Sequence, residues 1–289
     1  MPEGLVLIDK EQGWTSHDAV AKLRGILGTR KIGHAGTLDP MATGLLVLGV
    51  NAGTKLLQFL VGADKQYLAT IRLGMTTVSD DAEGETLETA SAGHLSKEEI
   101  LTGISKLTGE ISQTPSSVSA IKVDGKRAYD LVREGKDVDL KPREVVVSNF
   151  ELISEPKVVG NFLDIDVLVD CSSGTYIRAL ARDLGKDLGV GGHLTALRRT
   201  RVGNYHVDGA SKIAGEIEIL NLAEAALLLF PKLDLTDQDV VDLRHGKRIE
   251  SKGARVVSAV DPTGKLVGIL EQSGSSYKSV TIFPEVGNA

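Results

Sequence analysis

Residues 33–46 read GHAGTLDPMATGLL, and they show no regular alternation of apolar and polar side chains. We therefore predict an aperiodic loop from Ile32 to Gly44, and surface loops of this kind often carry function. Asp39 lies directly before Pro40, where the backbone is stiff. An aspartate before a proline also commonly caps a turn, and His34 can simply satisfy the loop, so these residues alone favour a structural role.

On the N-terminal side of this loop, the sequence predicts a strand followed by a capped helix. Residues 4–9, GLVLID, have the composition of a short buried strand. Thr15 and Asp18 have the spacing of a capping box, and Gly28 lies where the helix would end.

On the C-terminal side, strands and helices alternate irregularly. Residues 67–73 and 163–169 alternate apolar and polar side chains with a period of two, which predicts half-buried strands. Ser96 and Glu99 predict a capped helix start, and residues 177–188 have the apolar spacing of a second helix. This irregular order favours an α+β domain with a mixed sheet.

The sequence also predicts an insertion and a second domain. Residues 113–144 are rich in proline, serine and mixed charges, which indicates an insertion that leaves the sheet. We predict one domain over residues 1–231 and a small β-rich domain over residues 232–289. The second domain is expected to contain a helix capped at Thr236 and three strands, at residues 255–260, 265–270 and 277–283.

Composition excludes several classes of protein. The 289 residues carry 33 Lys and Arg against 39 Asp and Glu, a net charge of −6, which excludes a globally basic nucleic-acid coat protein but not a local basic groove. Cys171 is the single cysteine and the histidines are scattered, so we expect no disulfide and a metal-free interior. No apolar run approaches the ~20 residues of a membrane span, and we expect a cytoplasmic protein.

Two short motifs are weaker indications of function. Residues 49–55, GVNAGTK, lack the Gly-Lys-Ser/Thr ending of a phosphate-binding loop, and we reject that function. Ser119 and Lys122 have the S-x-x-K spacing of a serine nucleophile and its lysine base. No Lys-Thr-Gly triplet accompanies them, so a Ser-Lys hydrolase is a weak alternative.

Several separate stretches together resemble the TruB-type tRNA pseudouridine-55 synthases. The segment GHAGTLDPMATGLL resembles the catalytic signature of that family, and LIDKEQGWTSHDAV at residues 7–20 resembles its N-terminal signature. The later motifs of the family match Lys65–Tyr67, Gly174–Arg178 and Leu197–Arg199. The resemblance implies a pseudouridine synthase fold with a mixed, mainly antiparallel sheet, a thumb-like insertion at about residues 113–144, and a PUA-like C-terminal domain.

The resemblance also implies which residues act on the substrate. Asp39 matches the catalytic aspartate that engages the ribose, Tyr67 matches the tyrosine that stacks on the base, and Arg178 matches an arginine that pairs with the catalytic carboxylate. Tyr176 and Leu197 match residues that line the uracil pocket. Without the resemblance, Tyr67, Tyr176 and Leu197 would be interpreted as core residues and Arg178 as an exposed helix cation.

RNA binding is expected from a second group of residues. His34 matches the family residue that fills the space vacated by the flipped uridine, and Lys65 is a further predicted substrate-binding residue. The predicted phosphate contacts are two groups of cations, Arg24, Arg30 and Lys31 before the loop and Arg198, Arg199 and Arg201 near the end of the match. The family pattern is broken at Ser116, where a second proline is usual, and at Val118, where a tyrosine is usual. These two positions leave the conformation of the insertion open.

The resemblance therefore predicts an isomerase that converts the T-loop uridine of tRNA without cofactor or metal. The insertion, the short termini and the lack of a Lys-rich tail favour a stand-alone enzyme with no obligatory protein partner over the dyskerin branch, which works with guide RNA and partner proteins. A monomer is the default expectation. Activity as a tRNA-folding chaperone is also expected, and the alternative is a non-catalytic chaperone that only holds a flipped base.

Overall fold

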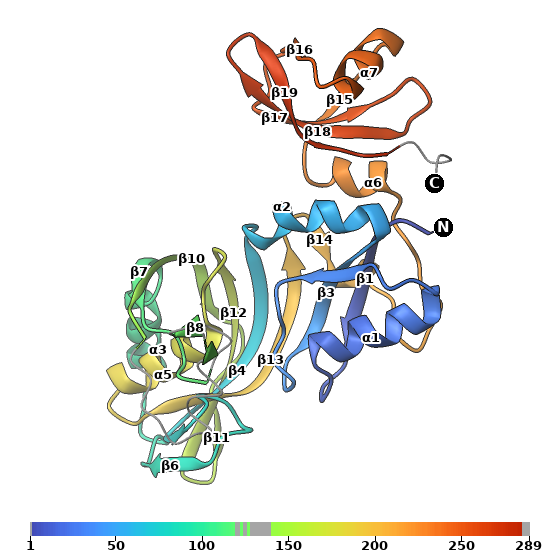
Figure 1. Ribbon diagram of the computed structural model, residues 1–289. Helices are drawn as coiled ribbons and strands as arrows, with labels where there is room; N and C mark the ends of the chain where they lie inside the picture. The colour runs from blue at the N-terminus through green and yellow to red at the C-terminus, as the bar shows by residue number, and fades with distance from the viewer. Residues whose placement is uncertain (1, 119–121, 124–125, 128–139, 285–289) are drawn as a thin grey trace. The chain divides into compact units, whose positions relative to one another are not determined.

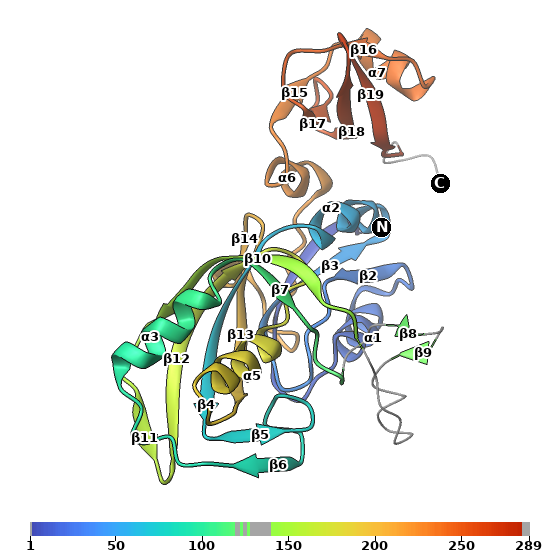
Figure 2. The same ribbon diagram turned by 90° about the vertical axis from the view of Figure 1, so that its left-hand side faces the viewer.

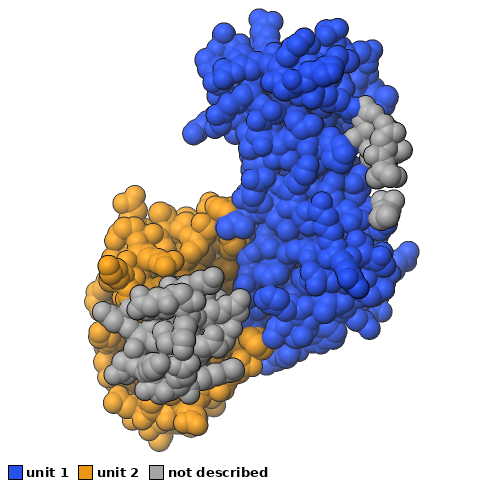
Figure 3. All heavy atoms as spheres, in the orientation of Figure 1, with its two compact units in different colours: residues 1–39, 44–61, 202–289 blue, residues 40–43, 62–201 orange. Residues whose placement is uncertain are grey.

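The computed structural model describes residues 2–118, 122–123, 126–127 and 140–284 (Figure 1). The chain forms two compact units (Figure 3). Unit 1 comprises residues 1–39, 44–61 and 202–289, and unit 2 comprises residues 40–43 and 62–201. Both units contain strands and helices, as predicted for an α+β fold. The predicted boundary between residues 231 and 232 stays a prediction.

Unit 1 begins with a sheet built around one central strand. Strand β3 (Thr43–Val50) pairs antiparallel with β1 (Gly4–Lys10) and with β2 (Ile32–Ala35). Helix α1 (Ser16–Leu27) starts with the predicted capping box and ends at Gly28, which has a left-handed backbone with φ 63°. The 3-10 helix η1 (Asn51–Leu56) and helix α2 (Leu57–Val61) follow β3.

The predicted loop from Ile32 to Gly44 was partly wrong. Its first four residues form β2, in which His34 lies opposite Leu48, and its last two residues begin β3. Pairing with a distant strand decides these residues, and neither periodicity nor propensity in the sequence reports such a pairing. Only residues 36–42 remain as the loop that contains Asp39.

Unit 2 is a sheet with two helices against one of its faces. Its strand order is β13 (Gly192–Val202), β4 (Lys65–Leu73), β12 (Phe162–Cys171), β10 (Arg143–Leu152) and β7 (Gly109–Gln113). From β4 to β7 the neighbours are antiparallel. Helices α3 (Lys97–Lys106) and α5 (Ile177–Asp187) pack on this sheet, as Figure 2 shows. The predicted alternation is confirmed, because every second residue of β4 and β12 is buried. The unit also contains the short strands β5 (Met75–Thr77), β6 (Thr86–Thr89) and β11 (Lys157–Val159).

The predicted insertion leaves and rejoins the sheet at one pair of strand ends. Gln113, the last residue of β7, lies opposite Arg143, the first residue of β10. Within the insertion, β8 (Lys122–Val123) pairs with β9 (Lys126–Arg127). Ser119 and the side chain of Lys122 lie outside the described residues, so the S-x-x-K motif has no structural test. The basic residues of the insertion from Lys122 to Lys136 have no described side chains either.

The C-terminal part of unit 1 is β-rich, as predicted. Its sheet has the order β15 (Lys232–Asp234), β17 (Val256–Val260), β18 (Leu266–Ser273), β19 (Ser276–Ile282) and β16 (Ile249–Glu250). The β15–β17 pair is parallel and the others are antiparallel. Helix α7 (Asp237–Arg244) is capped by Thr236, and Leu243 and Tyr277 belong to the buried core. Before this sheet come β14 (Tyr205–His206), the 3-10 helix η2 (Val207–Gly209) and α6 (Leu222–Leu227).

Within the described ranges, no helix is long and apolar enough to cross a membrane.

Candidate active site

The loop that carries Asp39 is fixed on its N-terminal side by a buried serine of α1. The Ser16 hydroxyl accepts a hydrogen bond from the Leu38 amide at 2.9 Å, and it lies 3.3 Å from the Leu38 carbonyl oxygen, to which it donates. Ser16 is fully buried and Leu38 is almost so. The backbone immediately before Asp39 is therefore held against the helix. Asp39 itself is half-buried.

The residues that follow Asp39, residues 40–43, belong to unit 2. Met41 and Ala42 are buried, and the Thr43 hydroxyl lies 3.5 Å from the carbonyl oxygen of Leu197, a residue of β13. The catalytic loop predicted from the sequence is therefore anchored at both of its ends by groups far away in the chain.

His34 lies on β2 and is half-buried. Its ring meets the ring of His17, on α1, edge to face, with the ring centroids 5.6 Å apart and an interplanar angle of 79°. The imidazole is thus a flat group held by a neighbouring ring, which suits the predicted role of filling space beside RNA.

Four of the predicted site residues lie on strands of the unit 2 sheet and are buried. Tyr67 and Lys65 are on β4, and Leu197 and Arg199 are on the neighbouring β13. Tyr67, Lys65 and Leu197 are each 8% exposed, and Arg199 is 1% exposed. Arg198, between Leu197 and Arg199, is half-buried. A phosphate contact by Arg199 stays a prediction, and the phosphate would have to approach a buried guanidinium.

Burial changes the proton affinity of Lys65. Desolvation of the ammonium group, and secondarily repulsion from Arg199, lowers the pKa of Lys65 to about 8. Lys65 Nζ donates to the carbonyl oxygen of Ala63 at 2.6 Å. Lys65 lies opposite Cys171 on β12, and burial raises the pKa of that thiol to about 11, so the cysteine is an unreactive core residue.

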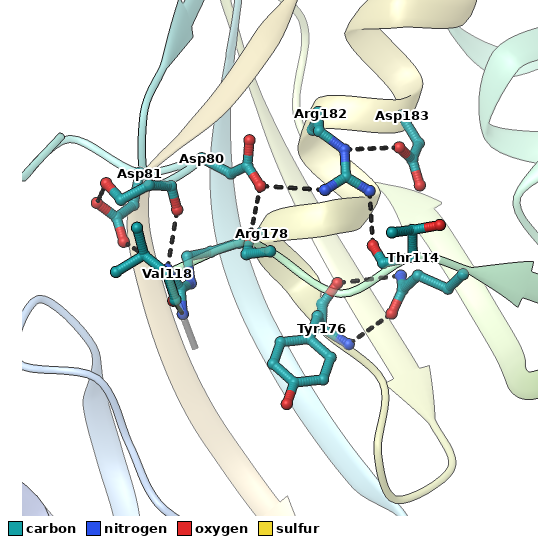
Figure 4. A network of polar contacts seen from close by, with 11 residues as sticks. Asp80, Asp81, Thr114, Val118, Tyr176, Arg178, Arg182 and Asp183 are labelled. Carbon is teal, nitrogen blue, oxygen red and sulfur yellow. Dashed lines mark hydrogen bonds and ion pairs between the residues drawn. The ribbon is translucent and has the colours of Figure 1, made fainter. Parts of the chain in front are cut away.

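Arg178, in the first turn of α5, is buried and engaged on several sides. Its Nη1 donates to the Ser79 carbonyl oxygen at 2.8 Å and lies 3.3 Å from Asp81 Oδ2, while its Nη2 donates to the Val118 carbonyl oxygen at 2.9 Å (Figure 4). Interpretation of Arg178 as an exposed helix cation is therefore wrong, since only 6% of the residue is exposed. Its predicted pairing with Asp39 stays a prediction.

Asp81 is a site residue that the sequence did not reveal. It is 3% exposed, and its Oδ1 accepts hydrogen bonds from the Ser79 hydroxyl at 2.5 Å and the Glu83 amide at 3.1 Å. A buried carboxylate satisfied in this way fixes the guanidinium that it faces. The only signal in the sequence was the pair Asp80-Asp81 after a strand, and nothing in it indicated that Arg178 lies beside that pair.

Tyr176, directly before α5, is positioned by a second unpredicted residue. The Tyr176 amide donates to Gln113 Oε1 at 2.8 Å, and Gln113 Nε2 donates to the Tyr176 carbonyl oxygen at 3.1 Å. Gln113 is 2% exposed. This reciprocal pair ties the start of α5 to the end of β7.

The site residues described above differ in chemistry: they are aromatic, aliphatic, cationic and acidic side chains. Unit 2 contains a buried tyrosine and a buried leucine on the sheet and a buried, oriented arginine at the start of α5, whereas Asp39 and His34 belong to unit 1. Among the described residues, no group of three or more His, Cys, Asp or Glu side chains is arranged to hold a metal ion.

Comparison with known proteins gives a consistent result along the chain. Family models match three consecutive parts: the N-terminal domain of TruB family pseudouridylate synthases at residues 24–177, the tRNA pseudouridylate synthase B C-terminal domain at 178–224, and the C-terminal model of tRNA pseudouridine synthase II at 230–284.

Curated relatives and one solved structure agree with the family models. A protein of Leifsonia xyli subsp. xyli (strain CTCB07), named tRNA pseudouridine synthase B, is 54% identical over 97% of this chain and 96% of its own length. A protein of the same name from Mycobacterium leprae (strain TN) is 52% identical over 98% of this chain and 91% of its own. A chain in the "Structure of H/ACA RNP bound to a substrate RNA containing 2'-deoxyuridine" aligns with a TM-score of 0.71 at 23% identity, over 98% of this chain and 85% of that one, which shows a shared fold.

Proposed function

Because the chain belongs to the TruB family of pseudouridylate synthases, we propose that it isomerises one uridine of tRNA, the T-loop uridine at position 55, to pseudouridine. The observation that carries this proposal is 54% identity to a tRNA pseudouridine synthase B along nearly the whole chain. We also propose that the protein is a cytoplasmic monomer and that it needs no partner protein.

The reaction is a rearrangement with no net change in composition. The bond between N1 of uracil and C1′ of ribose breaks, the base rotates, and a bond forms between C5 and C1′. The proton on C5 is then lost, and N1 gains a proton. The site must therefore hold a detached base away from water while the new bond forms.

The proposed roles of the site residues follow from their chemistry and from how the structure holds them. Asp39 acts at the ribose, and the anchors at Leu38 and Thr43 fix the loop that presents it. The Tyr67 ring stacks on the uracil, and Leu197 lines the same pocket with Tyr176. Arg178, oriented by Asp81, pairs with the Asp39 carboxylate and directs it at the sugar.

Substrate access requires the uridine to leave the T-loop stack. Extrusion of a stacked base costs about a few kcal/mol, which contacts to the RNA backbone and stacking in the pocket offset. His34 would occupy the vacated space, and Lys65, Arg198 and Arg199 would contact RNA. The same binding would support refolding of tRNA.

Release of tritium from C5 of uridine tests the proposed reaction. We expect a tRNA transcript labelled with [5-³H]uridine to release one equivalent of tritium per tRNA. A transcript in which cytidine replaces the T-loop uridine should bind and release none. Binding of both transcripts without release from either would favour the non-catalytic chaperone, and release from both would place the target uridine elsewhere.

A further inference from the structure

A second arginine of α5 repeats the arrangement of Arg178 one turn further along the helix. Residues four apart share a helix face, so Arg182 and Arg178 are neighbours. Arg182 Nη1 lies 3.2 Å from Asp80 Oδ2, and Arg182 Nη2 donates to the Thr114 carbonyl oxygen at 2.7 Å. Figure 4 shows that each arginine meets one of two adjacent aspartates and one carbonyl of residues 114–118.

Ser116 lies between these two carbonyls and provides a third attachment. It is fully buried, and its hydroxyl donates to Asp80 Oδ2, the oxygen that Arg182 also meets. The proline that is usual at this position of the family pattern has no hydroxyl to donate. Residues 114–118 are thus held at Thr114, Ser116 and Val118.

Asp80 is held in a costly conformation. Its backbone φ is 60°, in the left-handed region that non-glycine residues seldom occupy, and its side chain is 13% exposed. Burial also raises the pKa of the Asp80 carboxyl, and the bonds from Ser116 and Arg182 act in the opposite direction. Such strain persists only where the surroundings enforce it. Here the Leu194 amide donates to the Asp80 carbonyl oxygen at 3.0 Å, and two side chains hold the carboxylate.

One of the groups that bond Arg178 belongs to the segment that this second network holds. The planar guanidinium takes its direction from the groups it bonds: the Ser79 carbonyl, Asp81 and the Val118 carbonyl. Val118 belongs to a segment outside any helix or strand, so no sheet or helix hydrogen bonds fix its carbonyl. The nearest attachments of this segment are those at Thr114 and Ser116.

We infer that Arg182, Asp80 and Ser116 are positioning residues for the isomerisation: they fix residues 114–118 on α5, and the Val118 carbonyl in turn sets the direction of the Arg178 guanidinium. The inference rests on the proposed function, in which Arg178 acts at the catalytic carboxylate. It adds residues that touch neither the base nor the sugar.

Two substitutions test the network under single-turnover conditions, with enzyme in excess over tritiated tRNA. Arg182→Lys keeps the charge but cannot bond Asp80, Asp183 and the Thr114 carbonyl together, and Ser116→Ala removes one hydroxyl. We expect each to lower the rate constant of tritium release about tenfold, the effect of one lost hydrogen bond, while the Kd for tRNA stays within about twofold. A residue that only supports the fold would alter the unfolding midpoint without this split between rate and affinity.

The matched control is the exposed pair of Lys106 and Asp187, at the other end of α5, with its nitrogen and oxygen 2.9 Å apart. Asp187→Asn should leave rate and affinity unchanged. In an Arg178→Lys background, Ser116→Ala should have no further effect on rate, because the residue on which it acts is already altered.

Three results would overturn the inference: a wild-type rate for both substitutions, a rate loss matched by an equal loss of affinity, or an equal loss in the Arg178→Lys background. Failure of the proposed function has a different signature. In that case the wild-type protein releases no tritium, or Arg178→Lys alone leaves the rate unchanged.

Discussion

Two buried basic side chains of unit 2 differ in the groups that compensate for their burial. Arg178 faces the carboxylate of Asp81, and a paired charge can remain ionised in the interior. Lys65 donates to a backbone carbonyl and has Arg199 nearby, and its pKa falls to about 8. A buried lysine that is costly to keep charged does not stabilise the fold, and the role that we propose for Lys65 is contact with RNA.

Substitution of Lys65 by methionine should therefore stabilise the protein while weakening tRNA binding. The pKa is about 8 in the folded protein and 10.5 for the ordinary side chain. Below pH 8 the amine is protonated in both the folded and the unfolded protein, so burial of the charge lowers the stability by its full amount, up to about 3 kcal/mol. Above pH 10.5 the amine is neutral in both the folded and the unfolded protein, and this loss of stability disappears.

Denaturant unfolding from pH 7 to pH 10.5 measures this difference. Lys65→Met should be more stable than the wild type at pH 7, and the advantage should shrink as the pH rises above 8. Lys22→Met, at an exposed position of α1, serves as the control without such a trend. A constant advantage across this range would show that the charge on Lys65 is not what burial penalises.

Some residues of the site could be predicted from the sequence and others could not. The motifs identified Asp39, Tyr67 and Arg178 as candidates because each lies in a recognisable stretch. Asp81 and Gln113 lie in no such stretch, and Ser16 lies in the N-terminal signature, which does not single it out. The roles of Ser16, Asp81 and Gln113 arise from contacts with residues 22, 97 and 63 positions away, respectively. Local patterns carry no information about such distant partners.

Among the helices and strands, the best predicted features were those with a local cause. The capping boxes at Thr15, Ser96 and Thr236 all form as expected, because each is complete within four residues. Strand β2 was missed because its pairing with β3 lies outside any local window. The Asp39 loop is consequently shorter and more firmly held than the sequence indicated.

Helix α5 depends on a close approach that only glycine permits. A Cβ at Gly185 would lie 2.2 Å from backbone atoms of Gly191 and Gly192, whereas one at Gly25 of α1 would meet nothing within 4 Å. Gly185→Ala should destabilise the protein by about 3 kcal/mol or more, because neither backbone can move easily.

Gly25→Ala is the matched control, since both glycines lie within helices. It should stabilise the protein by about 0.5–1 kcal/mol. Urea unfolding of the two variants measures both effects. Equal and small effects would mean that α5 can move away from residues 191–192 without loss.

For the chain as a whole, the family resemblance predicted more about the fold and the reaction than the composition did. The net charge of −6 and the single cysteine excluded classes of protein without indicating a reaction. Matched motifs from residue 7 to residue 199 predicted the fold, and three family models and relatives about half identical agree with it. The network of Asp80, Ser116 and Arg182 could not be predicted, because it joins three segments that the sequence separates widely.

The central claim is that the Asp39 carboxylate acts on the ribose of a tRNA uridine. Asparagine keeps the size of this side chain and removes its negative charge, so Asp39→Asn separates chemistry from binding. The most direct test of the claim measures tritium release from [5-³H]uridine-labelled tRNA by this variant, with its tRNA affinity determined on the same preparation. We predict wild-type affinity and no release above background for Asp39→Asn. Release at the wild-type rate would contradict the proposed role of Asp39.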